Sequence, residues 1–107
     1  MRIIFCGYSR ASLECLYQLM GNYDIESSDV MIFTHDTSEN GEFIKHLKVN
    51  NFKFTYENIN NSYDLIREFN PDYLLSIYYR HIISTDILDI VNYKAMNLHP
   101  SLLPAYR

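Results

Sequence analysis

The sequence is short of the features that mark several common classes of protein. Lysine and arginine number 9 against 13 aspartate and glutamate, which gives a formal net charge of −4 in 107 residues. Dedicated nucleic-acid binders normally concentrate basic side chains, so this balance argues against that class. The N-terminal stretch MRIIFCGYSR has only a short apolar run, with no longer hydrophobic stretch behind it. This is the pattern of neither a signal peptide nor a membrane span, and a cytoplasmic protein is expected.

Motifs for metals, disulfides and dinucleotides are also scarce. The two cysteines, Cys6 and Cys15, lie in apolar patterns, which favours buried thiols of a reducing compartment, with a disulfide as the alternative. No HxxxH or CxxC pair is present, so no metal is expected. His46 is expected on a helix surface and His81 beside a strand end. The segment GYSR does not have the G-x-G-x-x-G pattern, so dinucleotide binding has no support.

Apolar runs typical of buried strands alternate with segments of helical spacing along the whole chain. The apolar fraction is 48%, which suits a globular core. Strands are predicted over residues 2–6, 30–34, 51–56, 72–78 and 94–98. Helices are predicted between them, with Ser9, Ser62 and Ser84 as starting residues of the first, third and fourth. The predicted inward positions are Leu13, Leu16, Tyr17 and Met20, then Phe43, Ile44 and Leu47, then Leu65, Ile66 and Phe69, and finally Ile87, Leu88 and Val91.

This alternation predicts a single α/β domain with a parallel sheet of about five strands and flanking helices. In such sheets, ligands bind beyond the carboxyl ends of the strands. The segments that follow the five predicted strands are GYSR, THDTSEN, YENIN, YYRHI and NLHPS. Polar and ionisable residues collect in these segments, so we expect the functional site at that edge of the sheet.

Asn97 and His99 lie two positions apart on the last predicted strand, so both side chains leave the same face of the sheet. A carboxamide can donate a hydrogen bond to an oxygen that gains negative charge. An imidazole can do the same, or can move a proton near neutral pH. The pair is therefore a candidate catalytic pair. The alternative is that both residues only satisfy a turn before Pro100.

Two further segments are candidates for binding a ligand. Tyr78, Tyr79 and Arg80 follow the fourth strand, where the arginine would contact a phosphate or carboxylate and the rings would wall a ligand. The alternative is a solvent-facing arginine beside two half-buried tyrosines. Ser9 and Arg10 open the first helix, whose N-terminal amides favour an anion such as pyrophosphate. A plain helix cap is the alternative there.

Three stretches carry a resemblance to a known family. The stretch MNLHPSLLPAYR, residues 96–107, is similar to the signature of the folate-dependent formyltransferases. IFTHDTSENGE, residues 32–42, and SIYYRHIISTDIL, residues 76–88, resemble the branch that formylates nucleotide sugars, such as the UDP-4-amino-4-deoxy-L-arabinose formyltransferases. The resemblance covers essentially the whole chain. It implies a Rossmann-like fold, N10-formyltetrahydrofolate as formyl donor, and a nucleotide-linked 4-amino sugar as acceptor, in lipopolysaccharide or O-antigen biosynthesis.

The resemblance also implies roles for individual residues. Asn97 would donate a hydrogen bond to the oxyanion, and His99 would stabilise the same charge or relay a proton. His35, Asp36 and Asn40 lie in a loop that is near the substrate in the sugar branch. The third catalytic residue of the family is an aspartate that lies beyond this sequence.

Residues 1–107 are therefore expected to be the N-terminal part of a formyl transferase domain without its C-terminal half, with little or no turnover alone. The exposed last strand predicts oligomerisation or poor solubility. No nucleic-acid or membrane partner is expected. The alternatives are part of a methionyl-tRNA formyltransferase, or a non-catalytic remnant that at most binds nucleotide.

Overall fold

The computed structural model describes residues 1–98 and contains a five-stranded parallel sheet in the order β3-β2-β1-β4-β5. The strands are β1 (Ile3–Gly7), β2 (Val30–Phe33), β3 (Lys53–Thr55), β4 (Tyr73–Ile77) and β5 (Ala95–Leu98). The helices are α1 (Ser9–Asn22), α2 (Gly41–Val49), α3 (Tyr63–Phe69) and α4 (Thr85–Ile90). Three short 3-10 turns are η1 (Ser27–Asp29), η2 (Ser38–Asn40) and η3 (Ile59–Asn61). The predicted α/β, Rossmann-like fold is confirmed.

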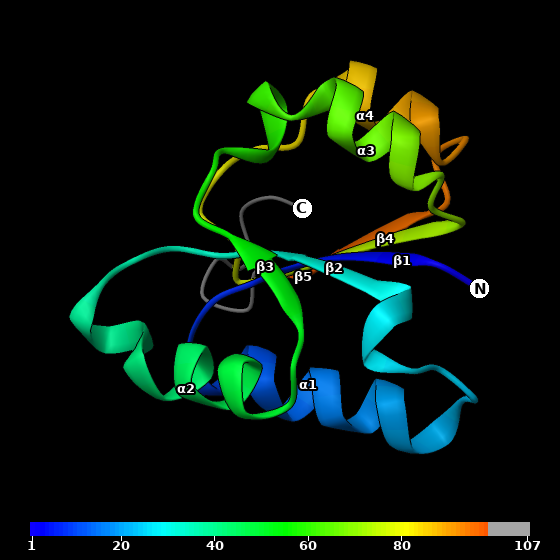
Figure 1. Cartoon of the computed structure of the whole chain (residues 1–107). Helices are drawn as coiled ribbons and strands as arrows, with labels where there is room; N and C mark the ends of the chain where they lie inside the picture. Colours follow the sequence, from blue (N-terminus) through cyan, green and yellow to red (C-terminus); the bar gives the residue numbers. More distant parts are fainter. Residues whose placement is uncertain (99–107) are drawn as a thin grey trace.

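The helices form a layer on each face of the sheet. Figure 1 shows α1 and α2 below the sheet and α3 and α4 above it. The side chains of the central strand β1 alternate between two cores, with Ile3 and Phe5 in the α1–α2 core and Ile4 and Cys6 in the α3–α4 core. This burial on both faces explains why the strand reads as a continuous apolar run. None of the helices in the described residues is long and apolar enough to cross a membrane.

The turn from β1 into α1 brings backbone and side chains into close contact. A Cβ atom added at Gly7 would lie 2.7 Å from Cε1 of Phe5 and 3.0 Å from Cβ of Ser12. The buried Ser12 hydroxyl accepts a hydrogen bond from the Tyr8 amide at 2.7 Å. The same oxygen lies 2.6 Å from the carbonyl oxygen of Ile77, at the end of β4. Ser12 therefore joins the carboxyl ends of the neighbouring strands β1 and β4.

Two predicted inward positions are wrong. Tyr17 is 42% exposed, because its hydroxyl reaches along the surface to Nδ1 of His46 at 2.6 Å. Leu65 is 44% exposed, because the next residue, Ile66, occupies the inward position of the short helix α3. The residues of α1 that are fully buried are Ser12, Leu13 and Leu16.

The two cysteines are both free thiols. Cys6 is fully covered, and burial raises the pKa of its thiol far above the usual range. Cys15 is only partly buried. The prediction of thiols is confirmed, whereas the prediction of complete burial holds for Cys6 alone.

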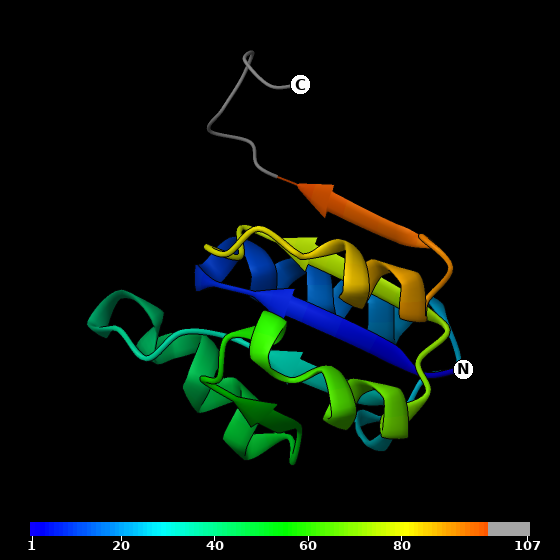
Figure 2. The same ribbon diagram turned by 90° about the horizontal axis from the view of Figure 1, so that it is seen from above.

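The strand β5 forms one edge of the sheet, as Figure 2 shows. All four of its residues are exposed, and it pairs only with β4 within the described residues. The parallel register places Asn97 beside Ser76, so both side chains leave the face covered by α3 and α4. The fold thus presents the candidate catalytic asparagine on an open edge.

Candidate functional site

The predicted site residues gather where the chain reverses its direction across the sheet. The chain moves from β1 outward to β2 and β3, and then returns to place β4 on the other side of β1. Crevices form at such reversal points, beyond the carboxyl ends of the strands. Tyr8 and Ser9 follow β1 at this edge, His35 follows β2, and Tyr78 and Arg80 follow β4.

His35 lies at the centre of a group of side chains that we call the His35 cluster. Its other members are the rings of Tyr8, Tyr79 and His81 and the side chain of Arg80. Its Nε2 atom accepts a hydrogen bond from the Arg80 amide at 3.0 Å. The His35 ring stacks on Tyr79, with ring centres 4.7 Å apart, and meets the edges of Tyr8 and His81. Burial, followed by the nearby charges of His81 and Arg80, lowers the pKa of His35 to about 4. The neutral imidazole therefore joins the segment after β2 to the segment after β4.

Tyr79 forms the base of the His35 cluster. The side chain is only 1% exposed, and its hydroxyl oxygen accepts a hydrogen bond from the Ile59 amide at 3.2 Å. Burial raises the pKa of Tyr79 to about 12. The ring packs in the α3–α4 core, and its contact with a ligand stays a prediction. The guanidinium group of Arg80 is exposed and lies 5.3 Å from the ring centre of Tyr8.

Tyr78, the first residue after β4, has a strained backbone conformation. Its φ angle is 64°, a left-handed value that costs a bulky residue about 1–2 kcal/mol. The amide of Tyr78 donates to the carbonyl oxygen of Leu98 at 3.0 Å. Its ring is partly buried against the α1–α2 core. Tyr78 and Tyr79 therefore pack on opposite faces of the sheet.

Asn40 is an internal bridge. Its side chain is fully buried, and its Oδ1 atom accepts a hydrogen bond from the Ser9 amide at 2.6 Å. Its Nδ2 atom donates to Oγ1 of Thr34 at 2.8 Å and to the carbonyl oxygen of His35 at 2.7 Å. Every polar atom of the side chain is thus used within the protein, and the contact of Asn40 with substrate stays a prediction. Asn40 shapes the predicted substrate loop.

The start of α1 differs from the prediction in two ways. Tyr8, not Ser9, occupies the N-cap position, and the Ser9 amide is satisfied by the side chain of Asn40. Arg10 pairs with Glu42 at 3.1 Å on the surface. This geometry favours a helix start that the protein itself satisfies over the predicted anion site. Asp36 is exposed, and its contact with substrate stays a prediction.

Asn97 lines a cavity of about 300 Å³, which we call the Asn97 cavity. Most of the surrounding side chains are apolar, and the full set is Leu74, Ser76, Ile82, Ile83, Leu88, Tyr93, Ala95, Met96 and Asn97. Ser76 is 1% exposed, and its hydroxyl has no hydrogen-bond partner in the part of the chain that the structure describes. Asn97 thus faces an opening and not the packed interior. His99, its predicted catalytic partner, lies outside the described residues.

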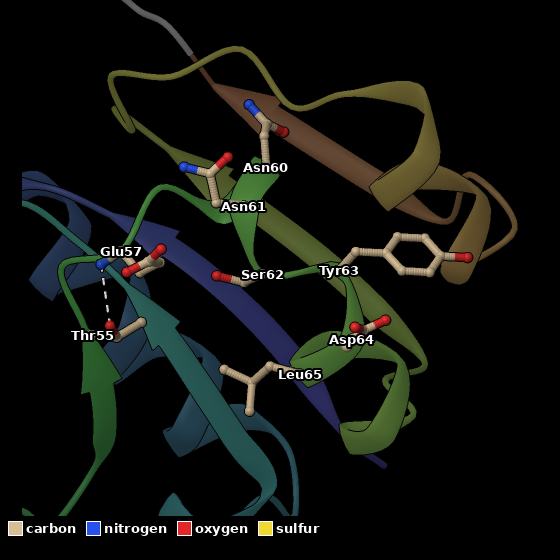
Figure 3. Close-up of a pocket in the computed structure, with 8 residues that line it drawn as sticks. All are labelled: Thr55, Glu57, Asn60, Asn61, Ser62, Tyr63, Asp64 and Leu65. Atoms are coloured by element: carbon tan, nitrogen blue, oxygen red, sulfur yellow. Dashed lines mark hydrogen bonds between the residues drawn. The ribbon is translucent and has the colours of Figure 1, made fainter.

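A second cavity, of about 430 Å³, lies at the carboxyl end of β3 (Figure 3). Its lining is mostly polar and consists of Thr55, Glu57, Asn60, Asn61, Ser62, Tyr63, Asp64 and Leu65. The amide of Glu57 is already bonded to Oγ1 of Thr55 at 3.1 Å. Within residues 1–98, no group of three or more His, Cys, Asp or Glu side chains is placed to hold a metal ion.

The sequence profile described as Formyl transferase matches residues 25–107. The chain belongs to the formyl transferase family. The match runs from the segment before β2 through β5, so it includes the loop of His35, the segment after β4 and the edge strand that carries Asn97. Both the Asn97 cavity and most of the His35 cluster therefore lie within the residues that the family profile matches.

Individual relatives act on different acceptors. This formyl transferase chain is 32% identical to the GDP-perosamine N-formyltransferase of Brucella melitensis biotype 1, over 99% of the chain and 42% of the relative. It is 28% identical to the methionyl-tRNA formyltransferase of Clostridium acetobutylicum, over 100% of the chain and 37% of the relative. It is 33% identical to the bifunctional polymyxin resistance protein ArnA of Wigglesworthia glossinidia brevipalpis, over 100% of the chain and 17% of the relative. The chain thus spans less than half the length of these relatives.

Sequence reasoning missed the apolar part of the site. Ser76 is the one polar residue in the strand YLLSI, and an isolated hydroxyl in a buried run was a usable signal. Ile82 and Ile83 line the Asn97 cavity from the segment after β4. Their apolar character gave no signal of function, because apolar side chains in a sequence first suggest a core.

Proposed function

We propose that the chain is the part of a formyltransferase that presents Asn97 to the formyl group of N10-formyltetrahydrofolate, for transfer to the amine of a nucleotide-linked amino sugar. The observation that carries the proposal is the position of Asn97 at the mouth of a cavity on the open edge of the sheet, in a chain of the formyl transferase family. A side chain in this place can reach a bound ligand, whereas one in the core cannot.

The chemistry needs a hydrogen-bond donor at the reacting carbonyl. The neutral amine forms a bond to the formyl carbon, and the carbonyl oxygen becomes an oxyanion. The bond from the formyl carbon to N10 then breaks, and the amine gives up a proton while N10 gains one. Nδ2 of Asn97 would donate to the oxyanion, and such a donor stabilises a transition state by about 3 kcal/mol. In this proposal His99 supports the same charge or relays the proton.

The Asn97 cavity suits the ring of the formyl donor. Small-molecule sites are mostly apolar and carry a few polar groups that fix the orientation of the ligand. The cavity has seven apolar or aromatic lining residues, and among residues 1–98 the buried hydroxyl of Ser76 has no hydrogen-bond partner. Because Ser76 and Asn97 are neighbours in register, a ring held near Ser76 would lie beside the proposed oxyanion donor.

The acceptor is assigned to the sugar class on charge. A tRNA carries many phosphates, and its binding normally depends on contacts from lysine and arginine. Residues 1–107 carry a formal net charge of −4, which favours the sugar class in this proposal. The identities to the sugar and tRNA enzymes are close to each other, so the acceptor must be tested directly.

The donor site is tested by titrating the chain with 5-formyltetrahydrofolate, a stable relative of the donor, in a calorimeter. Ala95→Leu places a larger side chain at the cavity lining, and we expect at least a tenfold loss of affinity. The control, Lys94→Leu, introduces leucine at the adjacent exposed position, which does not line the cavity. This variant should bind 5-formyltetrahydrofolate as tightly as the wild type does. Equal affinity of the two variants would refute the placement of the donor. The acceptor is tested by thermal shift, where a UDP- or GDP-linked amino sugar should stabilise the chain and methionyl-tRNA should not.

A further inference from the structure

One wall of the Asn97 cavity is formed by the segment that leaves β4. Ile82 and Ile83 line the cavity from this segment. Ile82 is 90% exposed, and Ile83 is only partly buried against the α3–α4 core, so packing alone holds this segment weakly. Segments with so few buried contacts open easily unless hydrogen bonds hold them. The position of this wall therefore depends on polar contacts with its neighbours as well as on the packing of Ile83.

Those contacts come from η3, the turn that follows β3. Nδ2 of Asn60 donates to the carbonyl oxygen of Ile82 at 2.7 Å. Oδ1 of the same side chain accepts from the Ser84 amide at 2.8 Å. A third bond joins the Ile59 amide to the hydroxyl of Tyr79 at 3.2 Å. We call residues 79–84 the wall segment. The turn η3 is thus bonded to its start at Tyr79, its middle at Ile82 and its end at Ser84.

This connection spans two strands of the sheet. β3 and β4 are not neighbours, because β2 and β1 lie between them. The turn η3 is itself held in place, since Oδ1 of Asn58 accepts from the Asn60 amide at 2.9 Å. The carbonyl oxygen of Asn58 also accepts from the Asn61 amide at 2.9 Å. Figure 3 shows Asn60 and Asn61 together on this turn.

We infer that Asn60 is a positioning residue for the Asn97 cavity, whose planar amide fixes the backbone from Ile82 to Ser84. The inference rests on the proposed function, because it assigns this wall to the formyl donor. A carboxamide suits this position because one side chain donates to the carbonyl of Ile82 and accepts from the amide of Ser84, two residues later. Asn60 is not among the residues that line the Asn97 cavity, so its effect would pass through the wall segment.

Three variants separate the two hydrogen bonds. Asn60→Ala removes both, and Asn60→Asp keeps the acceptor for Ser84 but places a carboxylate against the carbonyl oxygen of Ile82. Asn61→Ala is the control, because Asn61 is exposed on the same turn and has no role in the inference. All three proteins are compared with the wild-type chain by amide hydrogen exchange and by calorimetric titration with 5-formyltetrahydrofolate.

In Asn60→Ala we expect exchange at the Ser84 amide to become at least about tenfold faster, with the amides of β1 unchanged. The affinity for 5-formyltetrahydrofolate should fall by about tenfold. In Asn60→Asp the Ser84 amide should stay protected while the affinity still falls. Asn61→Ala should match the wild type in both measurements. If the β1 amides of Asn60→Ala also exchange faster, this variant has lost stability as a whole, and Asn60→Asp is used in its place. Wild-type affinity in Asn60→Asp then overturns the inference.

The remaining outcomes separate this inference from the proposed function. If the Ser84 amide of Asn60→Ala exchanges as in the wild type, Asn60 does not hold the wall segment, and the inference is overturned whatever the binding data show. A faster Ser84 amide with unchanged affinity overturns the positioning role, while the donor site stands. If the wild-type chain binds no 5-formyltetrahydrofolate, the proposed donor site fails. The exchange data alone then show whether Asn60 holds the wall segment.

Discussion

The hydrogen bond from the Arg80 amide to Nε2 of His35 makes the stability of the protein depend on pH. Protonation of this nitrogen removes the acceptor and places a cation beside Arg80 and His81. The ordinary pKa of a histidine is 6.5, and that of His35 in the folded chain is about 4. Between these pH values the unfolded chain binds the proton and the folded chain does not. Stability therefore rises with pH through this window, and is lost as the pH falls from about 6.5 toward 4.

The size of the effect follows from the two pKa values. At 1.36 kcal/mol for each tenfold change in proton affinity, the full difference sets an upper limit of about 3 kcal/mol. The ring is partly open to solvent, and screening reduces such contributions. We therefore expect about 1 kcal/mol between pH 7.5 and pH 5, carried by His35 alone.

The assay is urea unfolding at several pH values for the wild type, His35→Gln and a control, His46→Gln. Glutamine at position 35 does not titrate, so the stability advantage of the wild type over His35→Gln should shrink by about 1 kcal/mol from pH 7.5 to pH 5. His46 lies on α2 with its Nδ1 bonded to Tyr17, away from this cluster. The reasoning is refuted if the difference between the wild type and His35→Gln does not change with pH, or if it grows in acid.

Other parts of the structure lead to further predictions. Asn97→Ala should lower kcat by about 10²–10³ in any form of the protein that transfers formyl groups. The same change should alter the free energy of unfolding by less than about 0.5 kcal/mol, because the side chain is exposed; a large loss of stability would mean that Asn97 is a packing residue. Ser12→Ala should cost about 1–3 kcal/mol in urea unfolding, since it leaves the buried amide of Tyr8 without its acceptor; a neutral result would contradict the role given to this hydroxyl. The 107-residue chain should associate through β5, where Met96 is 63% and Leu98 43% exposed, and a monodisperse monomer in light scattering would disprove it.

The fold was largely predictable because the strands of a parallel sheet are buried on both faces. A strand such as Ile3–Gly7 must then be apolar throughout, and such a run is visible without any knowledge of its partners. The helix faces were less certain. Tyr17 has helical spacing with Leu13 and Leu16, yet its long side chain reaches a polar partner on the next helix. Spacing describes which residues share a side, but not which of them a neighbouring helix covers.

The candidate site was predictable only in its location. Asn97 follows from its place on the last strand, near the carboxyl edge. The roles of Asn40 and Asn60 depend on hydrogen bonds to residues 5 to 31 positions away, and sequence patterns do not record such partners. The burial of the Tyr79 ring was not predictable for a related reason. The left-handed backbone of Tyr78 ends the alternation of side chains along β4, so the strand pattern no longer tells which ring turns inward.

The exposed outer edge of β5 links assembly to chemistry. A polypeptide that adds hydrogen bonds along this edge must set its own side chains next to Asn97 and the mouth of its cavity. In the proposed mechanism, any strand that docks there would also determine which groups surround the reacting carbon.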